Sequence, residues 1–443
     1  MHIDKTLLLN ELANYLSVDM QILNDNFELH TLGTWDSLAM INMLGIVDEY
    51  YKLAITIDEV LQCNKIGDIF NIIENKKYQK KEVNNNLPKE NSISFKAIQY
   101  YKSYVASSIQ ERFWYLHEIA SDKSIYNLQT AIKCKGKLNL LALEDSVNEL
   151  IKRHFSLRTI FYWGKNILLQ EIVQYKPINL TFKRLSFDKK YSMEEGLQAS
   201  LRVEIEKPFD LTLGPLYRFM LFLIDEESYV LLIILHHSIA DYRSMTILVN
   251  ELSHVYNAFL KNEYSMLSPL SHQYIDYAGW QRKWMKTDNF SEQLHYWKQH
   301  LVDTSKVHPL PTDRVLVNDP KQQGNTYHIF LESDLINSMR SWCHTQGITL
   351  FSGLLAIYAI LLHCYSQQET IIIGSPLTNR NHPETKNMIG PIANLLAFRI
   401  VFCNTKIIKE IFQQVWNAVK LGLTHSEIPY DEIVKQLVVD KNS

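Results

Sequence analysis

The sequence is poor in the features that mark secreted, metal-binding or membrane-spanning chains. Its 443 residues include only 5 cysteines, which are widely spaced and form no C-x-x-C pair. This usage argues against a disulfide framework or a zinc ribbon and predicts a reducing, cytoplasmic compartment. The longest apolar runs, such as residues 229–235, are too short to span a bilayer, and the first residues lack the layout of a signal peptide. We therefore expect no membrane partner.

Neither sign of charge dominates the chain. Lys plus Arg is 45 and Asp plus Glu is 48, which gives a net charge of -3 and argues against a nucleic-acid partner. The charge is nevertheless uneven, because residues 1–75 hold 12 acidic residues and 3 lysines, a net of -9, and the remainder carries +6. The sequence thus joins an acidic module to a mildly basic one. Its length and its 46% hydrophobic content predict two or three domains with sizeable cores.

Apolar periodicity divides the chain into a helical module and a larger mixed region. Residues 1–76 read as short helices, and residues 77–96 form a polar, Lys- and Asn-rich stretch that we interpret as a linker. Residues 97–443 alternate helical and strand patterns, which predicts an α/β domain, divided at 275/276 into two subdomains. The expected helices are 144–153, 248–259, 350–365 and 408–421, and the expected buried strands are 230–235 and 370–374.

A first candidate functional segment is Leu32–Leu38, in which Asp36 and Ser37 precede a helical pattern. Taken alone, these residues form an ordinary helix N-cap. In its acidic helical context, however, the segment resembles the Asp-Ser-Leu motif of acyl and peptidyl carrier proteins, and Trp35 brings it closer to the acyl carriers. The resemblance implies a four-helix bundle over about residues 5–75. It also implies that Ser37 carries the covalent cofactor 4′-phosphopantetheine, attached by a phosphopantetheinyl transferase.

A second candidate segment follows the buried run Val230–Leu235. His236 and His237 come directly after it, and Asp241 lies close by. Neighbouring strand residues point to opposite faces, so the two histidines cannot easily share a metal ion, and we expect one in the core and one in a cleft. Histidine titrates near neutral pH and suits proton transfer. The residues alone do not decide whether such a histidine is catalytic or is a hydrogen-bonded structural residue. They also leave open whether Asp241 has a functional role or only forms a turn or half of an ion pair.

Six segments, taken in order, resemble motifs of the condensation domains of nonribosomal peptide synthetases. His236–Tyr242 resembles the family's His-His-x-x-x-Asp-Gly motif. The others are Ser107–Trp114, Arg153–Phe161, Tyr274–Gln281, Ile389–Asn394 and His425–Asp431. The two resemblances together imply a multidomain chain, in which an all-α four-helix carrier bundle precedes an α/β two-subdomain condensation domain of the chloramphenicol acetyltransferase-like fold.

The condensation-domain resemblance also implies roles for single residues. His237 is expected to be the catalytic residue, which positions or deprotonates the acceptor nucleophile or stabilises the tetrahedral intermediate. His236 belongs to the same catalytic motif, with a packed or hydrogen-bonded side chain. Asp241 completes the motif as half of an ion pair, with Arg158 as the expected structural partner. No metal is expected, since the sequence has no H-E-x-x-H motif or Cys/His cluster.

The sequence departs from the family pattern in two places. Tyr242 replaces the glycine that follows Asp241, and this change raises the expectation of altered substrate choice or reduced activity, because glycine adopts backbone angles that tyrosine does not. The sequence also ends at Ser443, where family members continue for another segment, so the second subdomain is expected to be incomplete and to expose an apolar sheet edge.

Three functions fit these observations. The favoured one is a carrier–condensation unit of a nonribosomal peptide or hybrid polyketide synthetase, in which the donor acyl thioester passes to the amine or hydroxyl of an acceptor on a downstream module. The second is a catalytically impaired condensation-like platform that recruits a partner enzyme. The third is an acyltransferase that forms an ester on a small free nucleophile. The expected partners are upstream and downstream synthetase modules or carrier domains.

Overall fold

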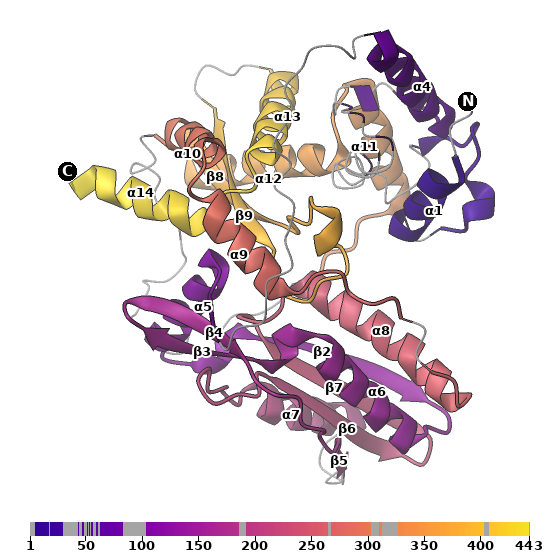
Figure 1. Cartoon of the computed structure of the whole chain (residues 1–443). Coiled ribbons are helices and arrows are strands. Elements are labelled where there is room, and N and C mark those ends of the chain that lie inside the picture. The colour runs from indigo at the N-terminus through magenta and orange to yellow at the C-terminus, as the bar shows by residue number, and fades with distance from the viewer. Residues whose placement is uncertain are drawn as a thin grey trace.

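The computed structural model describes most of the chain (Figure 1). The described residues are 5–16, 18–29, 43, 47, 51, 53, 55, 59–60, 63–82, 103–185, 192–264, 267–302, 310–311, 327–402 and 407–442. Ser37 lies outside them, as do Trp35 and Asp36. Within these ranges, no single helix is long and apolar enough to cross a membrane, and one helix pair bent by 105° passes that test by length and composition.

The N-terminal module has its own apolar core. Helix α1 (Lys5–Leu16), the short 3-10 helix η1 (Met20–Ile22) and helix α4 (Ile66–Glu82) belong to it. Apolar residues at helical spacing on α1 and α4 are buried together with residues from the segment between them: Leu8, Leu12, Met43, Val47, Ile66, Ile69, Phe70 and Ile73. Helix α4 continues through Glu82, beyond the linker start predicted after residue 76.

A four-stranded sheet forms the centre of the region after the linker. Its strand order is β2 (Asn127–Lys135), β7 (Ser228–His236), β6 (Tyr217–Asp225) and β5 (Thr181–Arg184). Strand β7 pairs antiparallel with β2 and β6, and Asn127 lies opposite His236. The continuous apolar run in β7 fits its central place, because a central strand covered on both faces buries every side chain. The predicted buried strand over 230–235 is thus confirmed.

Helices and a smaller sheet complete this N-terminal subdomain. The smaller sheet has the order β1 (Tyr104–Val105), β4 (Ile167–Ile172) and β3 (Thr159–Gly164). The helices are α5 (Ser108–Ile119), α6 (Leu140–Arg153), α7 (Met193–Ile205) and α8 (Tyr242–Leu260), with the 3-10 helix η4 (Phe155–Arg158). Helices α6 and α8 pack against each other. The predicted helices at 144–153 and 248–259 therefore exist and are longer than expected.

The C-terminal subdomain is built mainly from helices. They are α9 (Tyr274–Trp284), α10 (Asp288–His300), α11 (Ser333–Thr345), α12 (Leu350–Ser366), α13 (Ile408–Thr424) and α14 (Tyr430–Asn442). Strands β8 (Thr370–Leu377) and β9 (Asn394–Val401) pair antiparallel as a two-stranded sheet. The predicted subdomain boundary at 275/276 falls inside α9, which packs against α5, β1 and η4 of the N-terminal subdomain.

Helix α12 is apolar on its outer face as well as its inner one. Leu355, Ala356 and Ala359 face the core of the C-terminal subdomain. Other apolar residues of the same helix are exposed: Leu354, Ile357, Tyr358, Leu361 and Tyr365. An exposed set of this kind is unusual on a water-facing helix.

Candidate active site

His237 lies at the end of the central strand. Strand β7 ends at His236, and the backbone N–H of His237 donates to the Tyr126 carbonyl at 2.9 Å, which prolongs the pairing with β2. Its ring stacks on Phe113 of α5, with the centroids 4.5 Å apart and the planes 9° apart. The buried Nδ1 of His237 has no hydrogen-bond partner among the described residues. The ring is therefore held in place while a nitrogen stays unpaired.

The environment of His237 favours its neutral form. Burial lowers the pKa of the His237 imidazole, and the negative charge of Asp241 opposes this only in part. A charged imidazolium loses its hydration when buried, and this is why burial acts in that direction. A neutral imidazole carries one lone pair and can accept a proton at neutral pH.

His236 occupies the opposite side of the strand end, as the alternation of strand side chains predicts. It is fully buried, and its Nδ1 lies 2.8 Å from the Ser238 Oγ and its Nε2 lies 3.2 Å from Nδ1 of His117. Burial lowers the pKa of His236 from 6.5 to about 3. Both ring nitrogens are occupied by protein groups, so His236 has a packed, hydrogen-bonded position. Among the described residues, no group of three or more potential ligands is placed to hold a metal ion.

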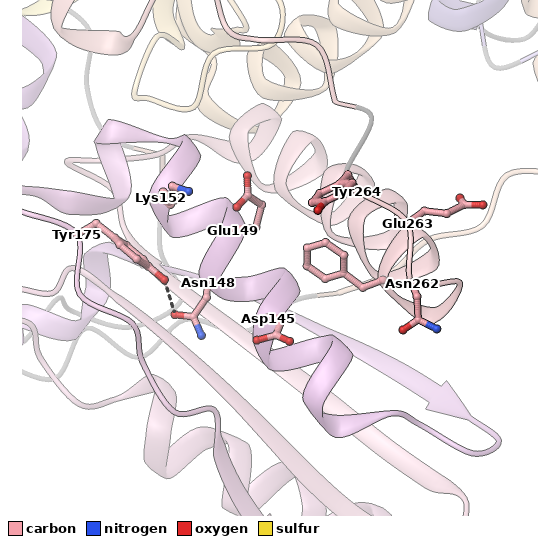
Figure 2. Close-up of a pocket in the computed structure, with 9 residues that line it drawn as sticks. Asp145, Asn148, Glu149, Lys152, Tyr175, Asn262, Glu263 and Tyr264 are labelled. Atoms are coloured by element: carbon pink, nitrogen blue, oxygen red, sulfur yellow. Dashed lines mark hydrogen bonds between the residues drawn. The ribbon is translucent and has the colours of Figure 1, made fainter.

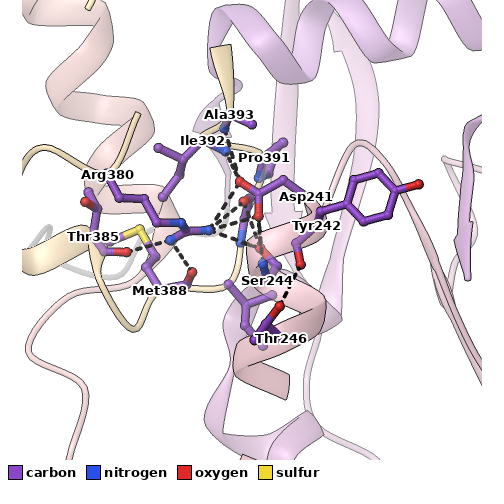
Figure 3. A network of polar contacts seen from close by, with 12 residues as sticks. Asp241, Tyr242, Ser244, Thr246, Arg380, Thr385, Met388, Pro391, Ile392 and Ala393 are labelled. Atoms are coloured by element: carbon purple, nitrogen blue, oxygen red, sulfur yellow. Dashed lines mark hydrogen bonds and ion pairs between the residues drawn. The ribbon is translucent and has the colours of Figure 1, made fainter. Parts of the chain in front are cut away.

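Asp241 ties the two subdomains together (Figure 3). It is the N-cap of α8, and its Oδ1 accepts from the backbone N–H and the hydroxyl of Ser244, both at 2.7 Å. Nη2 of Arg380, from the segment after β8, donates to Oδ1 at 3.0 Å and to Oδ2 at 3.2 Å. The N–H groups of Ile392 and Ala393 donate to Oδ2 at 3.1 Å. With its acceptor sites filled, Asp241 has a structural position.

The ion pair also sets the charge state of Asp241. Burial alone raises the pKa of this carboxyl, but the Arg380 guanidinium and the Ser244 hydrogen bonds outweigh burial and hold the pKa below 3.8. Asp241 and Arg380 are 2% and 5% exposed, so water screens the pair little. Asp241 therefore stays ionised at neutral pH.

The predicted partner of Asp241 was wrong. Arg158 donates instead to three backbone carbonyls of its own subdomain: Ile151 at 3.1 Å, Val173 at 2.8 Å and Lys152 at 3.3 Å. These bonds satisfy carbonyls at the C-terminal end of α6 and after β4, so Arg158 stabilises the local structure of its own subdomain. Arg380 follows a buried strand in a polar run, and no periodicity distinguishes it from a surface arginine. Only the packing of the two subdomains brings it to Asp241.

The loop before β9 closes the network around Asp241. The Ser244 hydroxyl lies 3.0 Å from both the backbone nitrogen and the carbonyl oxygen of Gly390. A Cβ on Gly390 would overlap the ring of Tyr274, whose hydroxyl lies 2.7 Å from the Ser107 Oγ. Tyr274 and Tyr277 of α9 are almost fully buried, as expected for core residues.

Tyr242 occupies an ordinary helical position. It is the first residue of α8 and is not among the residues with positive φ, so the backbone freedom of glycine is not needed there. The side chain is 76% exposed, and its ring points away from the Asp241–Arg380 network (Figure 3). Tyrosine at this position therefore causes no backbone strain and leaves the ion pair intact.

A cavity of about 620 Å³ lies away from this site, beside α6 and the end of α8 (Figure 2). Its lining includes Asp145, Glu149 and Lys152 of α6, together with Tyr175 and Tyr264. Tyr175 bonds Asn148, a residue whose amide also bonds the Ile178 backbone. None of the predicted site residues lines this cavity.

The site thus has a histidine pair at the end of the central strand of an α/β subdomain, and an Asp241–Arg380 ion pair that joins this subdomain to the second. Comparison with known families makes the assignment specific: residues 100–443 match the model of the condensation domain. The chain belongs to the condensation-domain family, and its fold is that of the chloramphenicol acetyltransferase-like group. Residues 2–90 match the C-terminal acyl carrier domain of the highly reducing polyketide synthase sdgA. The chain is thus a carrier–condensation fusion.

Its relatives are nonribosomal peptide synthetases. One of the linear gramicidin synthase proteins of Brevibacillus parabrevis is 32% identical over 77% of this chain and 4% of that protein. Malpinin synthetase of Mortierella alpina is 32% identical over 74% of this chain and 4% of that protein. The chain thus spans a small part of the length of these relatives.

Solved structures share its fold. The X-domain from teicoplanin biosynthesis is 25% identical and superposes with a TM-score of 0.71, covering 78% of this chain and 76% of that one. The first condensation domain of the CDA synthetase, 16% identical with a TM-score of 0.63 over 76% and 79% of the two chains, supports the fold.

Proposed function

We propose that this chain transfers a donor acyl group, held as a thioester on Ser37, to the amine of an acceptor on a downstream carrier domain. Condensation domains of nonribosomal peptide synthetases are acyl or peptidyl transferases, and this chain has the fold and the motif of that family. The observation that carries the proposal is His237. Its ring stacks on Phe113, burial favours its neutral form, and its buried Nδ1 has no hydrogen-bond partner in the part of the chain that the structure describes.

His237 manages the proton of this reaction. The acceptor nitrogen forms a bond to the donor carbonyl carbon, the carbon–sulfur bond breaks, and the proton lost by the amine ends on the departing thiol. A neutral imidazole beside the nucleophile can take that proton and return it. Asp241 and Arg380 take no part in the proton transfer, and they hold the start of α8 next to His237. Most of the rate gain comes from holding the two substrates in reacting geometry.

The carrier module supplies the donor. Phosphopantetheine on Ser37 provides the thiol that forms the thioester, and a phosphopantetheinyl transferase attaches it. Ser37 lies outside the described residues, so its role rests on the motif and on the match of residues 2–90 to a carrier domain. The net charge of -9 on residues 1–75 and +6 on the rest favours weak electrostatic docking of the loaded carrier.

The first test is a loading and transfer assay on the full chain. The protein is treated with a broad-specificity phosphopantetheinyl transferase and acyl-coenzyme A, and its intact mass is compared with that of Ser37→Ala. It is then mixed with separate acceptor carriers loaded with aminoacyl or hydroxyacyl groups, and the product is identified by mass. We expect loading at Ser37 alone and an amide product. His237→Ala should slow transfer by about 10²- to 10⁴-fold, the usual contribution of general acid–base catalysis.

The matched control is His254→Ala, which removes an exposed histidine of α8. It should load and transfer at the wild-type rate. Absence of loading on folded protein would overturn the carrier role. Equal transfer by the wild type and His237→Ala would overturn the role of His237. Faster reaction with small free alcohols or amines than with carrier-bound acceptors would favour a free-standing acyltransferase.

A second function is favoured by one pair of observations. The X-domain from teicoplanin biosynthesis, which resembles this chain, has been solved in a complex with OxyB. Tyr242 replaces the motif glycine here and is exposed beside the site. We therefore keep a platform role, in which the domain recruits a partner enzyme to the loaded carrier. This role predicts no transfer by the wild type and by Tyr242→Gly alike, despite full loading of Ser37.

A further inference from the structure

A second buried histidine lies directly behind the active-site turn. His117 of α5 is 2% exposed, and its Nδ1 lies 3.2 Å from Nε2 of His236, with the two rings edge to face and their centroids 5.0 Å apart. The family motifs do not single out His117. It is not among the residues expected to act, and only the fold brings it to the histidine pair.

The hydrogen bonds around these rings run in one direction. The backbone N–H of Ser238 donates to Nδ1 of His236 at 3.1 Å, so that nitrogen must be the acceptor and the ring proton must lie on Nε2. The His236 Nε2–H then donates to Nδ1 of His117. The proton of His117 therefore lies on its Nε2. A chain of donors runs from Ser238 through His236 to His117.

This chain of hydrogen bonds includes the residues on both sides of His237. His236 and Ser238 flank it in the sequence, and the bond between them fixes the turn in which it stands. The backbone N–H of Ile239 also donates to the His236 carbonyl at 3.0 Å. Phe113, one helical turn before His117 on the same face of α5, stacks on the His237 ring. Helix α5 thus contacts the His237 ring through Phe113 and, through His117, the His236 ring that bonds the backbone of the turn.

We propose that His117 and His236 are positioning residues, which hold the turn of His237 against α5 through this directed chain of hydrogen bonds. The expected effect on rate rests on the proposed transferase function, whereas the chain of hydrogen bonds rests on the structure alone. Burial of both rings keeps them neutral, since the pKa values of His117 and His236 are lowered, and a neutral ring can both accept and donate. Loss of the acceptor on His117 would free the turn and misplace the His237 ring.

The test compares His117→Leu with His117→Asn in the full, loaded chain. Leucine removes the acceptor, whereas the asparagine Oδ1 can replace Nδ1. We expect His117→Leu to lower kcat for transfer by about 10- to 100-fold, with the KM for the acceptor carrier changed little, because small displacements of a catalytic group lower the rate of the bound complex. His117→Asn should recover most of the rate. His254→Asn is the matched control and should leave kcat unchanged.

A double variant separates positioning from a general structural role. If His117 acts through His237, His117→Leu should have no further effect on transfer in a His237→Ala background. A full additional loss there would overturn the proposal, as would an unchanged kcat in folded His117→Leu. If His117→Leu does not fold, His117→Ala, which also lacks the acceptor, takes its place, and its rate and its additivity with His237→Ala decide in the same way.

A readout without activity distinguishes this inference from the proposed function. In protein labelled with ¹⁵N-histidine, ring nitrogen signals report which nitrogen carries the proton. We expect the Nε2–H form for both His117 and His236, no titration of His236 between about pH 5 and 8, and a shift of the His237 signals in His117→Leu. The Nδ1–H tautomer of His236 would overturn the proposed chain of hydrogen bonds. Inactive wild type with these signals intact would reject the transferase function alone.

Discussion

The two subdomains contribute to the candidate site in different ways. The N-terminal subdomain supplies His237 at the end of a strand in a four-stranded sheet, and α5 of the same subdomain holds the ring. The C-terminal subdomain supplies Arg380 and the N–H groups of Ile392 and Ala393, all directed at Asp241. One side carries the proposed catalytic histidine, and the other fixes the start of α8, the helix that follows it.

This division shows where rigidity is needed. The described contacts of His237 lie within one subdomain, where its ring stacks on Phe113 and its backbone N–H bonds the Tyr126 carbonyl. Asp241 joins the two subdomains, and its six contacts cross their junction or cap α8. Substitutions at the contacts between the subdomains should therefore lower the stability of the fold, and three predictions compare them with substitutions elsewhere.

The largest effect is expected for Arg380→Leu. It leaves Asp241 buried without its cation, and removal of one partner of a buried pair costs about 3–5 kcal/mol. The free energy of unfolding, measured in urea, should fall by that order. Arg243→Leu, which removes an exposed arginine of α8, should change it by less than about 0.5 kcal/mol. Similar urea midpoints for the two variants would show that the ion pair does not join the subdomains.

Gly390→Ala should have an intermediate effect. Its methyl group would overlap the buried Tyr274 ring, and overpacking of this kind costs about 1–3 kcal/mol. Gly374→Ala on β8 is the matched control, because a Cβ there would meet Leu395 atoms at ordinary contact distances of 3.6 Å and beyond. Thermal unfolding should show a lower midpoint for Gly390→Ala only. Equal midpoints of thermal unfolding would mean that the loop containing Gly390 accommodates the methyl group without a loss of stability.

The smallest effect, taken per pH unit, is a difference in pH dependence between His236, which is held within one subdomain, and Asp241, which is paired across the junction. His236 has a folded pKa of about 3 against 6.5, so the unfolded chain binds more protons in this range. Its contribution to stability is present above about pH 6.5 and is lost as the pH falls, by up to about 1.4 kcal/mol per pH unit. The folded pKa of Asp241 is below 3.8, so its contribution is lost only in more acid solution.

Urea unfolding at a series of pH values checks this prediction. His236→Asn should flatten the decline between about pH 6 and 4, and Asp241→Asn should flatten it only below about pH 4. His117 and His237, whose pKa values are also lowered, add to the slope in the upper range. If His236→Asn leaves the slope above pH 4 unchanged, His236 is not buried in its neutral form.

Much of the fold was predictable because apolar patterns report burial directly. The run Val230–Leu235 predicted a buried strand, and the alternation of strand side chains predicted opposite places for His236 and His237. The helices at 350–365 and 408–421 were found for the same reason. Predictions were less accurate at boundaries, since α4 continues past residue 76 and α9 crosses 275/276. Local patterns do not encode where an apolar face meets another element.

Of the site, the sequence predicted His237 and an arginine partner for Asp241, and it placed that partner on the wrong residue. Arg158 was chosen because it lies in a recognised motif, but its side chain satisfies carbonyls at the end of α6. Arg380 lies 139 positions from Asp241 and shows no periodic signal. Such a pair forms only when two separately folded surfaces meet.

The sequence by itself determined the order of the two modules, the strand that presents the histidines and the family to which the chain belongs, because motifs and apolar periods are local properties. The tertiary structure alone decided which arginine neutralises Asp241, that Tyr242 is an unstrained and exposed helical residue, and that His117 stands behind His236. These facts depend on contacts between distant segments, whose geometry is set by the packing of whole subdomains rather than by the residues next to them in the chain.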